Sequence, residues 1–324
     1  MPDRVKYSFT IPCYRSESTV MIVVDEIEAT MEEHDEESYE IVLVNDCSPD
    51  NVWKVIQERC KKDSHIVGVS LTKNFGQHSA LMAGYHQAKG DIIISLDDDG
   101  QTPADHVYVL LNKLEEGYDV VYATYSEYHQ TLFRRIGSVL AKKMTYYMLD
   151  VKEDLPSGSS YYAMRRFLRD EIIKYENPYP YLGGLVLRST RNVAMVPIPH
   201  RSRLTGKSGY SLKKLVSLWL NGFTAFSVKP LELGSIIGVL LAVSGFLLAL
   251  FIIIRRIINP TIHEGWSSLF SFMMVLSGVI MFMLGIIGEY IGRIYICINK
   301  SPQFIIKDIV SKDSIPEGWE RRDI

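Results

Sequence analysis

The chain has 324 residues, 47% hydrophobic and 23% charged, which excludes an intrinsically disordered protein and leaves room for more than one domain. It carries 35 lysines and arginines against 38 aspartates and glutamates, a net charge of −3. This balance excludes a protein built mainly to bind nucleic acid, because such proteins carry a basic excess. The four cysteines are scattered without C-x-x-C spacing, which favours a reducing compartment over a disulfide framework.

The first 230 residues alternate between strand and helix patterns. Apolar runs of strand length occur at Tyr7–Ile11, Ile41–Val44, Ile66–Leu71, Ile92–Leu96 and Val120–Tyr125. Helical stretches are expected between them, at residues 18–33, 50–62, 78–88 and 103–116. The alternation predicts an α/β, Rossmann-like domain whose mostly parallel sheet is covered by helices on both faces. In such sheets ligands bind at the carboxyl ends of the strands.

Polar residues follow three of these strands, as Pro12–Arg15, Asn45–Asp46 and Asp97–Asp99. Because Ser48 or Asp50 can cap the next helix, the Asp46 carboxylate is expected to be free for a ligand N–H group. Since the three strand ends meet at one edge of the sheet, the sequence predicts a binding site there.

The acidic triplet Asp97–Asp99 is followed by Gly100 and Gln101. Adjacent carboxylates repel one another unless a cation offsets their charge, and oxygen ligands at a strand end suit Mg²⁺ or Mn²⁺ holding a diphosphate. In an extended segment Asp97, Asp99 and Gln101 point to one side, while Asp98 points away and is expected to be structural. The alternative is a plain helix start, with Thr102 as N-cap and the aspartates as turn formers.

Two other loops carry polar groups. Lys73–Ser79 contains His78, a residue that in such a place is more often a surface or capping histidine than a catalyst. Arg203–Tyr210 is a basic, glycine-containing loop of a kind that can close over phosphates, although it lacks P-loop spacing. The alternative for this second loop is an ordinary solvated loop.

Two apolar segments of 22 residues, Leu233–Ile254 and Ser267–Gly288, contain no charge. Each is long enough to cross a bilayer as a helix, so a transmembrane hairpin is predicted, with both ends on the cytoplasmic side by the distribution of basic residues. Amphipathic stretches at 132–149 and 211–226 are predicted to lie in the membrane interface or to pack on the domain. The expected divisions are a catalytic domain at 1–210, an interfacial helix at 211–230, the hairpin at 231–292 and a cytoplasmic tail at 293–324.

The segments together resemble the family-2 glycosyltransferases of GT-A fold. More narrowly, they resemble the polyprenyl-phosphate sugar transferases, such as the undecaprenyl-phosphate aminoarabinose and glucose transferases and dolichyl-phosphate mannose synthase. The matching segments are Ile11–Tyr14, Val44–Asp46, Asn74–Ala80, Ala83–Gly84, Gly90–Asp91, Leu96–Gln101 with its D-x-D-x-Q pattern, Arg203–Tyr210 and Gly288–Tyr295.

This resemblance implies inverting, metal-dependent transfer of a sugar from a UDP-sugar to a polyprenyl phosphate such as undecaprenyl phosphate, for cell-envelope glycan modification. It assigns the nucleotide sugar to Pro12, Tyr14, Glu17, Asp46, Asn74, Asp97 and Asp98. It assigns Mg²⁺ or Mn²⁺ to Asp97, Asp99 and Gln101, the departing phosphates to the loop residues Arg203, Lys207 and Ser208, and the acceptor phosphate to Arg134, Ser138 and Ser159. Asp97, Asp99 and Arg203 are the implied catalytic residues. The relatives also imply a membrane protein that forms a homo-oligomer, a tetramer in several of them.

The chain departs from these relatives at three places. Arg15 and Ser16 follow Tyr14 where Asn-Glu is usual, Tyr162 replaces an arginine, and Pro156 replaces an aspartate. The lost carboxylate is tolerable, since a lipid monophosphate is mostly dianionic at pH 7 and needs little help from a general base. The alternatives are a processive polysaccharide synthase with a hydroxyl acceptor, a non-catalytic nucleotide-binding scaffold and a transporter. The first normally carries Q-x-x-R-W, which is missing, and two uncharged spans offer a transporter no polar pathway.

Overall fold

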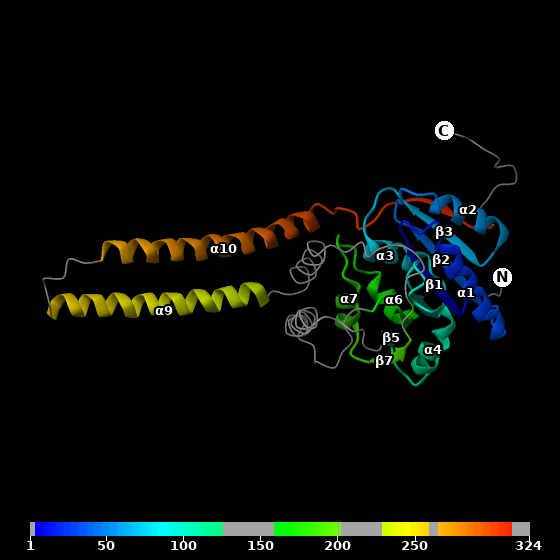
Figure 1. Ribbon diagram of the computed structural model, residues 1–324, viewed down its shortest axis with the longest axis horizontal. Coiled ribbons are helices and arrows are strands. Elements are labelled where there is room, and N and C mark those ends of the chain that lie inside the picture. The colour runs from blue at the N-terminus through cyan, green and yellow to red at the C-terminus, as the bar shows by residue number, and fades with distance from the viewer. Residues whose placement is uncertain (1–3, 126–158, 200, 202–228, 259–264, 313–324) are drawn as a thin grey trace. The chain divides into compact units, whose positions relative to one another are not determined.

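A computed structural model describes residues 4–125, 159–199, 201, 229–258 and 265–312 (Figure 1). The chain divides into two compact units. One comprises residues 1–215 together with 300–324, and the other comprises residues 216–299. The predicted interfacial stretches and the loop 203–210 lie outside the described residues.

The first unit is built on one sheet, in which eight strands are described, in the order β7-β5-β6-β4-β1-β2-β3-β8. Their bounds are β1 Tyr7–Cys13, β2 Tyr39–Asn45, β3 Ile66–Leu71, β4 Ile92–Ser95, β5 Val120–Tyr125, β6 Tyr162–Arg165, β7 Val193–Ile198 and β8 Ile306–Val310. Strand β1 is central and pairs in parallel with both β2 and β4, β2 with β3, and β5 with β7. Strand β6 is antiparallel to β4 and β5, and β8 is antiparallel to β3.

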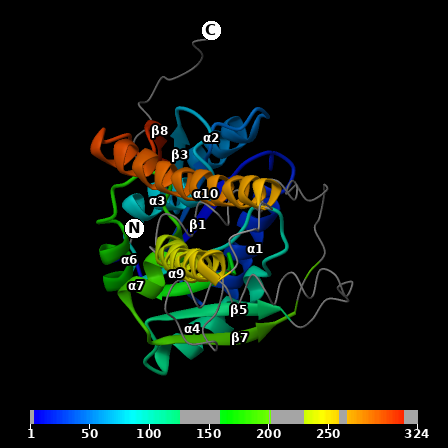
Figure 2. The same cartoon turned by 90° about the vertical axis from the view of Figure 1, so that its left-hand side faces the viewer.

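Helices cover both faces of this sheet (Figures 1 and 2). They are α1 Val20–Glu33, α2 Val52–Lys62, α3 Gln77–Gln87, the short η1 Ala104–His106, α4 Val107–Glu115, α6 Arg166–Ile172 and α7 Leu182–Ser189. The side chains of β1 and β2 alternate between the faces, as the two-residue period of a strand requires. Phe9 and Ile11 pack in the cluster that holds α1, α2 and α4, whereas Val42 and Val44 pack against α3.

The predicted α/β fold with a mostly parallel sheet is confirmed, and the five predicted strands all form. One local prediction is wrong: Thr102 does not cap a helix. Its hydroxyl instead accepts the Asp97 N–H at 3.2 Å, and the chain then enters η1 without a side-chain cap. A hydroxyl can satisfy either a helix end or a nearby turn, and here it closes the turn that contains the acidic triplet.

Strand β8 was not predicted from the sequence. It follows the second apolar segment and joins the sheet edge beside β3, with Gly68 opposite Val310 and Ser70 opposite Asp308. Phe304 and Ile306 pack on the apolar cluster beneath α3. Residues 304–310 therefore belong to the same compact unit as the strands and helices of the first 199 residues.

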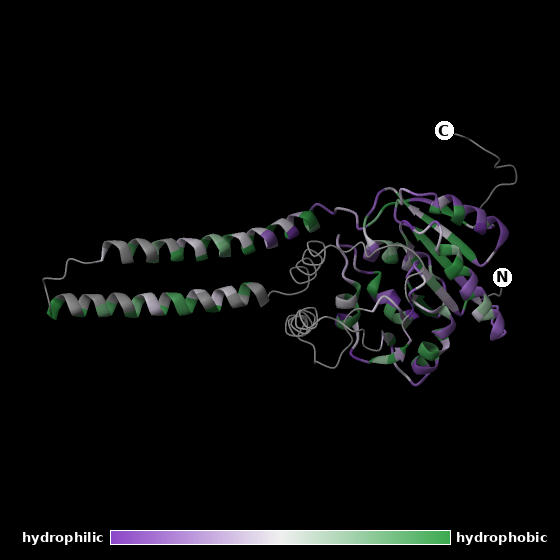
Figure 3. Ribbon diagram, in the orientation of Figure 1, coloured by the Kyte–Doolittle hydropathy of each residue, from purple (hydrophilic) through white to green (hydrophobic). Residues whose placement is uncertain are grey.

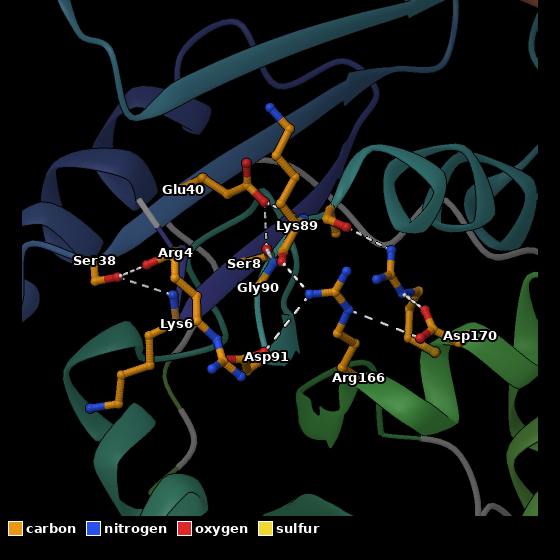
Figure 4. A network of polar contacts seen from close by, with 12 residues as sticks. Arg4, Lys6, Ser8, Ser38, Glu40, Lys89, Gly90, Asp91, Arg166 and Asp170 are labelled. Carbon is orange, nitrogen blue, oxygen red and sulfur yellow. Dashed lines mark hydrogen bonds and ion pairs between the residues drawn. The ribbon is translucent and has the colours of Figure 1, made fainter. Parts of the chain in front are cut away.

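A polar network ties together the amino ends of β1, β2 and the segment before β4 (Figure 4). The Ser8 hydroxyl donates to the buried Glu40 carboxylate at 2.6 Å and accepts the Gly90 N–H at 2.7 Å. Asp91 accepts from Arg4 at 2.8 Å and lies 3.8 Å from Arg166. The Gly90–Asp91 pair, one of the segments behind the family resemblance, is thus structural and lies at the amino ends of the strands.

The second unit contains two long helices, α9 Lys229–Ile258 and α10 Trp266–Ile298. Large apolar side chains along both are exposed, among them Phe246, Leu240, Met281 and Phe282. In Figure 3 the α10 ribbon carries hydrophilic colour only near its C-terminal end. Among the described residues one segment, Val275–Ile298, has the length and composition of a membrane span, and Gly234–Leu247 in α9 is a shorter apolar segment.

Candidate active site

The candidate site lies where the order of the strands reverses. Strands β2 and β3 follow on one side of β1, and β4 pairs on the other. Strand β1 ends at Cys13 and β4 ends at Ser95, and the Tyr14 N–H donates to Asp98 at 3.0 Å, so the segments that follow these two strands lie beside each other. This is the crevice in which open α/β sheets bind ligands.

Asp97 is held on both carboxylate oxygens. Gln77, the first residue of α3, donates its side-chain amide to Oδ1 at 2.9 Å, and the Ser160 hydroxyl donates to Oδ2. The carboxylate is therefore oriented by groups from α3 and from the segment before β6.

Asp98 links β4 to the segment after β1, as expected for a structural residue. Its Oδ2 accepts the backbone N–H of Tyr14 at 3.0 Å. Burial, with a smaller contribution from the charge of Asp99, raises the pKa of Asp98 to about 6, although the Ser16 hydroxyl and the hydrogen bond from Tyr14 oppose the shift. The Tyr14 ring itself is 42% exposed and lies 5.5 Å from the Arg15 guanidinium, so it presents an open aromatic face at the site.

Asp99 begins a tight turn. Its Oδ1 accepts the Gln101 N–H at 3.0 Å, and Gly100 between them has a φ of +74°. This backbone conformation favours glycine, which explains the residue at this position. Asp99 and Gln101, two of the three predicted metal ligands, thus share one turn that begins two residues after Asp97; that they bind a metal with Asp97 remains a prediction.

The Asp46 carboxylate is not free, contrary to the sequence-based expectation. Its two oxygens accept the backbone N–H groups of Phe75 at 2.7 Å and Gly76 at 2.9 Å. Burial raises the pKa of Asp46, and these two bonds oppose the rise. Asp46 thus fixes the loop that leads into Gln77, and its assigned contact with a base remains a prediction.

Glu17 connects the segments that follow β1 and β2. Its carboxylate accepts the Asn51 backbone N–H at 3.1 Å and the Asn51 side-chain amide at 3.2 Å, and its own N–H donates to Asp50 at 3.0 Å. Arg15 N–H donates to the Ser48 hydroxyl at 2.7 Å. These bonds join the segments that follow β1 and β2, so the structure gives Glu17 a bracing role, and its predicted role in nucleotide binding remains a prediction.

His78 lies beside Gln77 in the first turn of α3. Its Nδ1 is buried and has no hydrogen-bond partner among the described residues, and its ring is edge-on to Tyr181 with centroids 5.8 Å apart. Burial lowers the pKa of His78 to about 4, so the imidazole is neutral at physiological pH. The His78 residue is partly exposed, and it does not cap α3, whose first turn has no side-chain cap bond.

The remaining predicted residues are distributed as follows. Pro12 is buried in β1, the Asn74 side chain is exposed in the loop before α3, and the Ser159 hydroxyl accepts the Tyr161 N–H at 3.2 Å. Arg134, Ser138, Arg203, Lys207 and Ser208 lie outside the described residues. Arg201, two positions before Arg203, forms ion pairs with Glu26 and Asp105.

Tyr162, which by the family resemblance replaces an arginine, belongs to the core. It is 4% exposed, and its hydroxyl meets that of Tyr85, which lies 2.8 Å from the Ser95 hydroxyl. Burial raises the pKa of Tyr162, so the group stays neutral. Tyr162 therefore supplies no positive charge for an acceptor phosphate.

Comparison with known proteins agrees with this geometry. The model of the family "Glycosyl transferase family 2" matches residues 8–173, which include β1 to β4 and the whole acidic turn. The chain belongs to glycosyl transferase family 2. A second model, the "GtrB C-terminal hairpin", matches residues 229–294, which hold α9 and most of α10.

Relatives of this glycosyltransferase match it over nearly its full length. The undecaprenyl-phosphate 4-deoxy-4-formamido-L-arabinose transferase of Proteus mirabilis is 33% identical over 94% of both chains, and that of Photorhabdus laumondii is 32% identical over 97% of both. An uncharacterized glycosyltransferase of Bacillus subtilis, YkcC, is 30% identical over 95% of both.

Solved structures agree in fold. Mannosyl-3-phosphoglycerate synthase from Rubrobacter xylanophilus matches with a TM-score of 0.51 at 18% identity, over 67% of this chain and 71% of that one. Glucosyl-3-phosphoglycerate synthase from Mycobacterium tuberculosis, in complex with Mn²⁺, UDP and phosphoglyceric acid, matches with a TM-score of 0.50 at 19% identity, over 67% and 75%. These similarities confirm the glycosyltransferase fold of the catalytic domain.

Sequence reasoning missed Gln77 and Ser160 as members of the site. Both contact Asp97, yet they lie 20 and 63 positions from it in the chain. The only sequence signal was their position, since Gln77 stands in the family segment Asn74–Ala80 and Ser160 follows the predicted Ser159. Spacing could not show that both reach the same carboxylate.

The burial of His78 leads to a testable pH dependence. The unfolded chain takes up a proton on this histidine near pH 6.5, whereas the folded protein does so only near pH 4. Acidification from pH 7 to pH 5 therefore lowers the free energy of unfolding through this group, by about 1–2 kcal/mol. The variant His78→Gln should lose less stability over that range than the wild type, as measured by unfolding in detergent at both pH values. Equal losses in the two proteins would show that His78 is accessible to protons in the folded state.

Proposed function

We propose that this glycosyltransferase moves a sugar from a UDP-sugar to undecaprenyl phosphate. The observation that carries the proposal is the presence, in one chain, of an acidic turn at the switch point of a family-2 domain and of a C-terminal apolar hairpin. The full-length relatives carry names that specify undecaprenyl phosphate as the acceptor. A soluble acceptor gives no reason for exposed apolar helices, whereas a lipid acceptor does.

The nucleotide would bind across the carboxyl ends of β1 and β4. The exposed Tyr14 ring offers a surface for the base, and the segments braced by Asp46 and Glu17 form the walls around it. The diphosphate would then lie over the acidic turn. Arg203 and its loop are proposed to cover the departing phosphates from outside the described residues.

The acidic turn fits a divalent cation, either Mg²⁺ or Mn²⁺. Within the described part of the chain no group of three or more histidine, cysteine, aspartate or glutamate residues could hold a metal. Nucleotide enzymes, however, usually bind such ions with one or two carboxylates plus substrate phosphates, and Asp97, Asp99 and the Gln101 amide supply that kind of oxygen set. When bound, the ion would offset the charge of the diphosphate and of the leaving UDP. A related fold has been crystallised with Mn²⁺ and UDP, which supports this assignment.

The acceptor phosphate needs little activation, since it is mostly dianionic at pH 7. Its oxygen would attack the anomeric carbon as the bond to UDP breaks, with inversion of configuration. Neither the buried Tyr162 nor Pro156 provides a base, which suits a nucleophile that is already ionised. A hydroxyl acceptor, the alternative, requires a base to remove its proton.

The hairpin is proposed to cross the membrane twice. Segment 216–299 begins and ends at the same compact unit, so a chain that crosses the bilayer there must cross an even number of times. α9 and α10, of 30 and 33 residues, are each long enough to do so. The catalytic domain is proposed to be cytoplasmic, and assembly into a homo-oligomer is proposed from the family resemblance.

The test uses purified full-length protein in liposomes that contain undecaprenyl phosphate, with Mn²⁺ or Mg²⁺. UDP-glucose, UDP-N-acetylglucosamine and UDP-4-deoxy-4-formamido-L-arabinose are supplied in turn, and organic-extractable sugar and released UDP are measured. Lipid-linked sugar from one donor is expected. UDP without lipid product would point to another acceptor. No UDP from any donor would contradict the proposal and favour a nucleotide-binding scaffold.

A further inference from the structure

Gln303 is a buried polar residue that the proposed reaction does not use. It is the fifth residue after Ile298, where α10 ends, and its side chain is 7% exposed. Its amide nitrogen donates to two backbone carbonyl oxygens, those of Tyr175 at 3.0 Å and Asn177 at 2.9 Å. A side-chain amide has two N–H donors, so this group is fully used in holding one loop.

The residues around Gln303 form a strap, here defined as residues 303–310. Thr72 donates its N–H to the Ile305 carbonyl at 3.0 Å, and β8 continues the strap along β3. The Phe304 ring lies 5.5 Å from the ring of His86, near the C-terminal end of α3. The strap therefore contacts both the 175–177 loop and the helix that begins at Gln77.

Both of these elements lead to Asp97. Downstream of the loop, Tyr181 precedes α7 and places its ring edge-on to His78. His78 follows Gln77, whose amide is 2.9 Å from Asp97 Oδ1. A displacement of the loop would be passed through Tyr181 and His78 to the side chain that orients the first aspartate of the acidic turn.

We propose that Gln303 is a positioning residue for the sugar-nucleotide site, because it holds the loop that sets Tyr181 and His78 against the start of α3. The proposal rests on the proposed function, in that the site at Asp97 is taken to bind a sugar nucleotide. The Tyr181 and His78 rings are neutral and largely apolar, the kind of surface that suits a sugar ring rather than a phosphate. Tyr181 and His78 are accordingly placed on the sugar side of the donor.

Three variants of the full-length protein test this. Gln303→Glu keeps the size of the side chain but turns its oxygens toward two carbonyl oxygens, which repel it. Gln303→Met keeps the length without charge or donor. Lys307→Gln is the matched control, since Lys307 is an exposed residue of the same strap and lies at the irregularity of β8, between the pairs Ser70–Asp308 and Leu71–Ile306.

Two measurements are made on each protein. Amide hydrogen exchange is expected to quicken in Gln303→Glu at residues 174–184 and in the first turn of α3, with a smaller change in Gln303→Met and none in Lys307→Gln. The KM for the sugar nucleotide that the wild type uses should rise about tenfold in Gln303→Glu, since a buried hydrogen-bonding group is lost. The affinity for UDP alone, measured by calorimetry with Mn²⁺, should stay within about twofold, because the Ser160 hydroxyl still holds the other oxygen of Asp97.

The outcomes separate this proposal from the proposed function. Faster exchange confined to residues 303–310, or a rise in KM matched by an equal loss of UDP affinity, would overturn the positioning role. A wild type that transfers no sugar would refute the proposed function, and the exchange pattern would still decide whether Gln303 positions the loop and α3.

Discussion

The variant Asp99→Asn is expected to lose sugar transfer by a factor of about 10³ or more while its fold survives. Asparagine has the same shape and keeps an oxygen that can accept the Gln101 N–H, now at 3.0 Å, so the turn around Gly100 should persist. What disappears is one negative charge at the place where a divalent ion and a diphosphate are proposed to meet. Loss of the group that stabilises the leaving UDP accounts for a barrier increase of about 4 kcal/mol.

The matched control for Asp99 is Asp308→Asn, because Asp308 is an exposed carboxylate on β8. It removes the same charge from the same domain and should leave turnover unchanged. Turnover is measured in the liposome assay, Mn²⁺ binding by the loss of its free magnetic-resonance signal, and folding by thermal unfolding in detergent. An Asp99→Asn protein that still turns over with unchanged dependence on Mn²⁺ would remove Asp99 from the metal site.

The central part of the fold could be predicted because its strands are buried on both faces. Runs such as Ile66–Leu71 and Val120–Tyr125 are mostly apolar and contain no charge, and the structure gives β3 and β5 the same bounds. Strand β6, with four residues, and β8, with Lys307 and Asp308 exposed, lack such a run. Their pairing depends on partners far away in the chain, which a local pattern does not contain.

In the candidate site, too, one feature could be predicted from the sequence and another could not. The acidic turn was recognisable because adjacent carboxylates directly after a buried strand repel one another unless a cation offsets their charge. The expectation that Asp46 is free failed because it considered only the helix that follows Asp46 in the chain, and the N-cap residue of that helix makes no side-chain cap bond. The loop 75–76 comes from another strand end and occupies both oxygens of Asp46. Proximity in the fold, which spacing does not encode, decided the outcome.

The second large effect is expected at the opposite ends of the strands, where Gly90→Ala should destabilise the catalytic domain by about 3 kcal/mol. A Cβ at residue 90 would lie 2.7 Å from both the backbone nitrogen and the hydroxyl of Ser8, and 2.9 Å from the carbonyl carbon of Tyr7. Two of these three atoms belong to the backbone of β1, the central strand, so they cannot move aside as a flexible side chain would.

Relief of this clash would also disturb the network of Figure 4. The Ser8 hydroxyl would have to leave its place between the Gly90 N–H and the Glu40 carboxylate, and Glu40 is only 3% exposed. A buried carboxylate that loses a donor adds its own desolvation cost to the strain. Thermal unfolding of the full-length protein in detergent measures the sum of both effects.

Gly183→Ala is the control for Gly90, since a Cβ there would meet only the Tyr181 ring at ordinary distances of 3.5 Å or more. Gly183 lies in α7, where alanine favours the helix, so this variant should be as stable as the wild type or slightly more so. A Gly90→Ala protein as stable as Gly183→Ala would mean that β1 and the segment before β4 can separate at this end without cost.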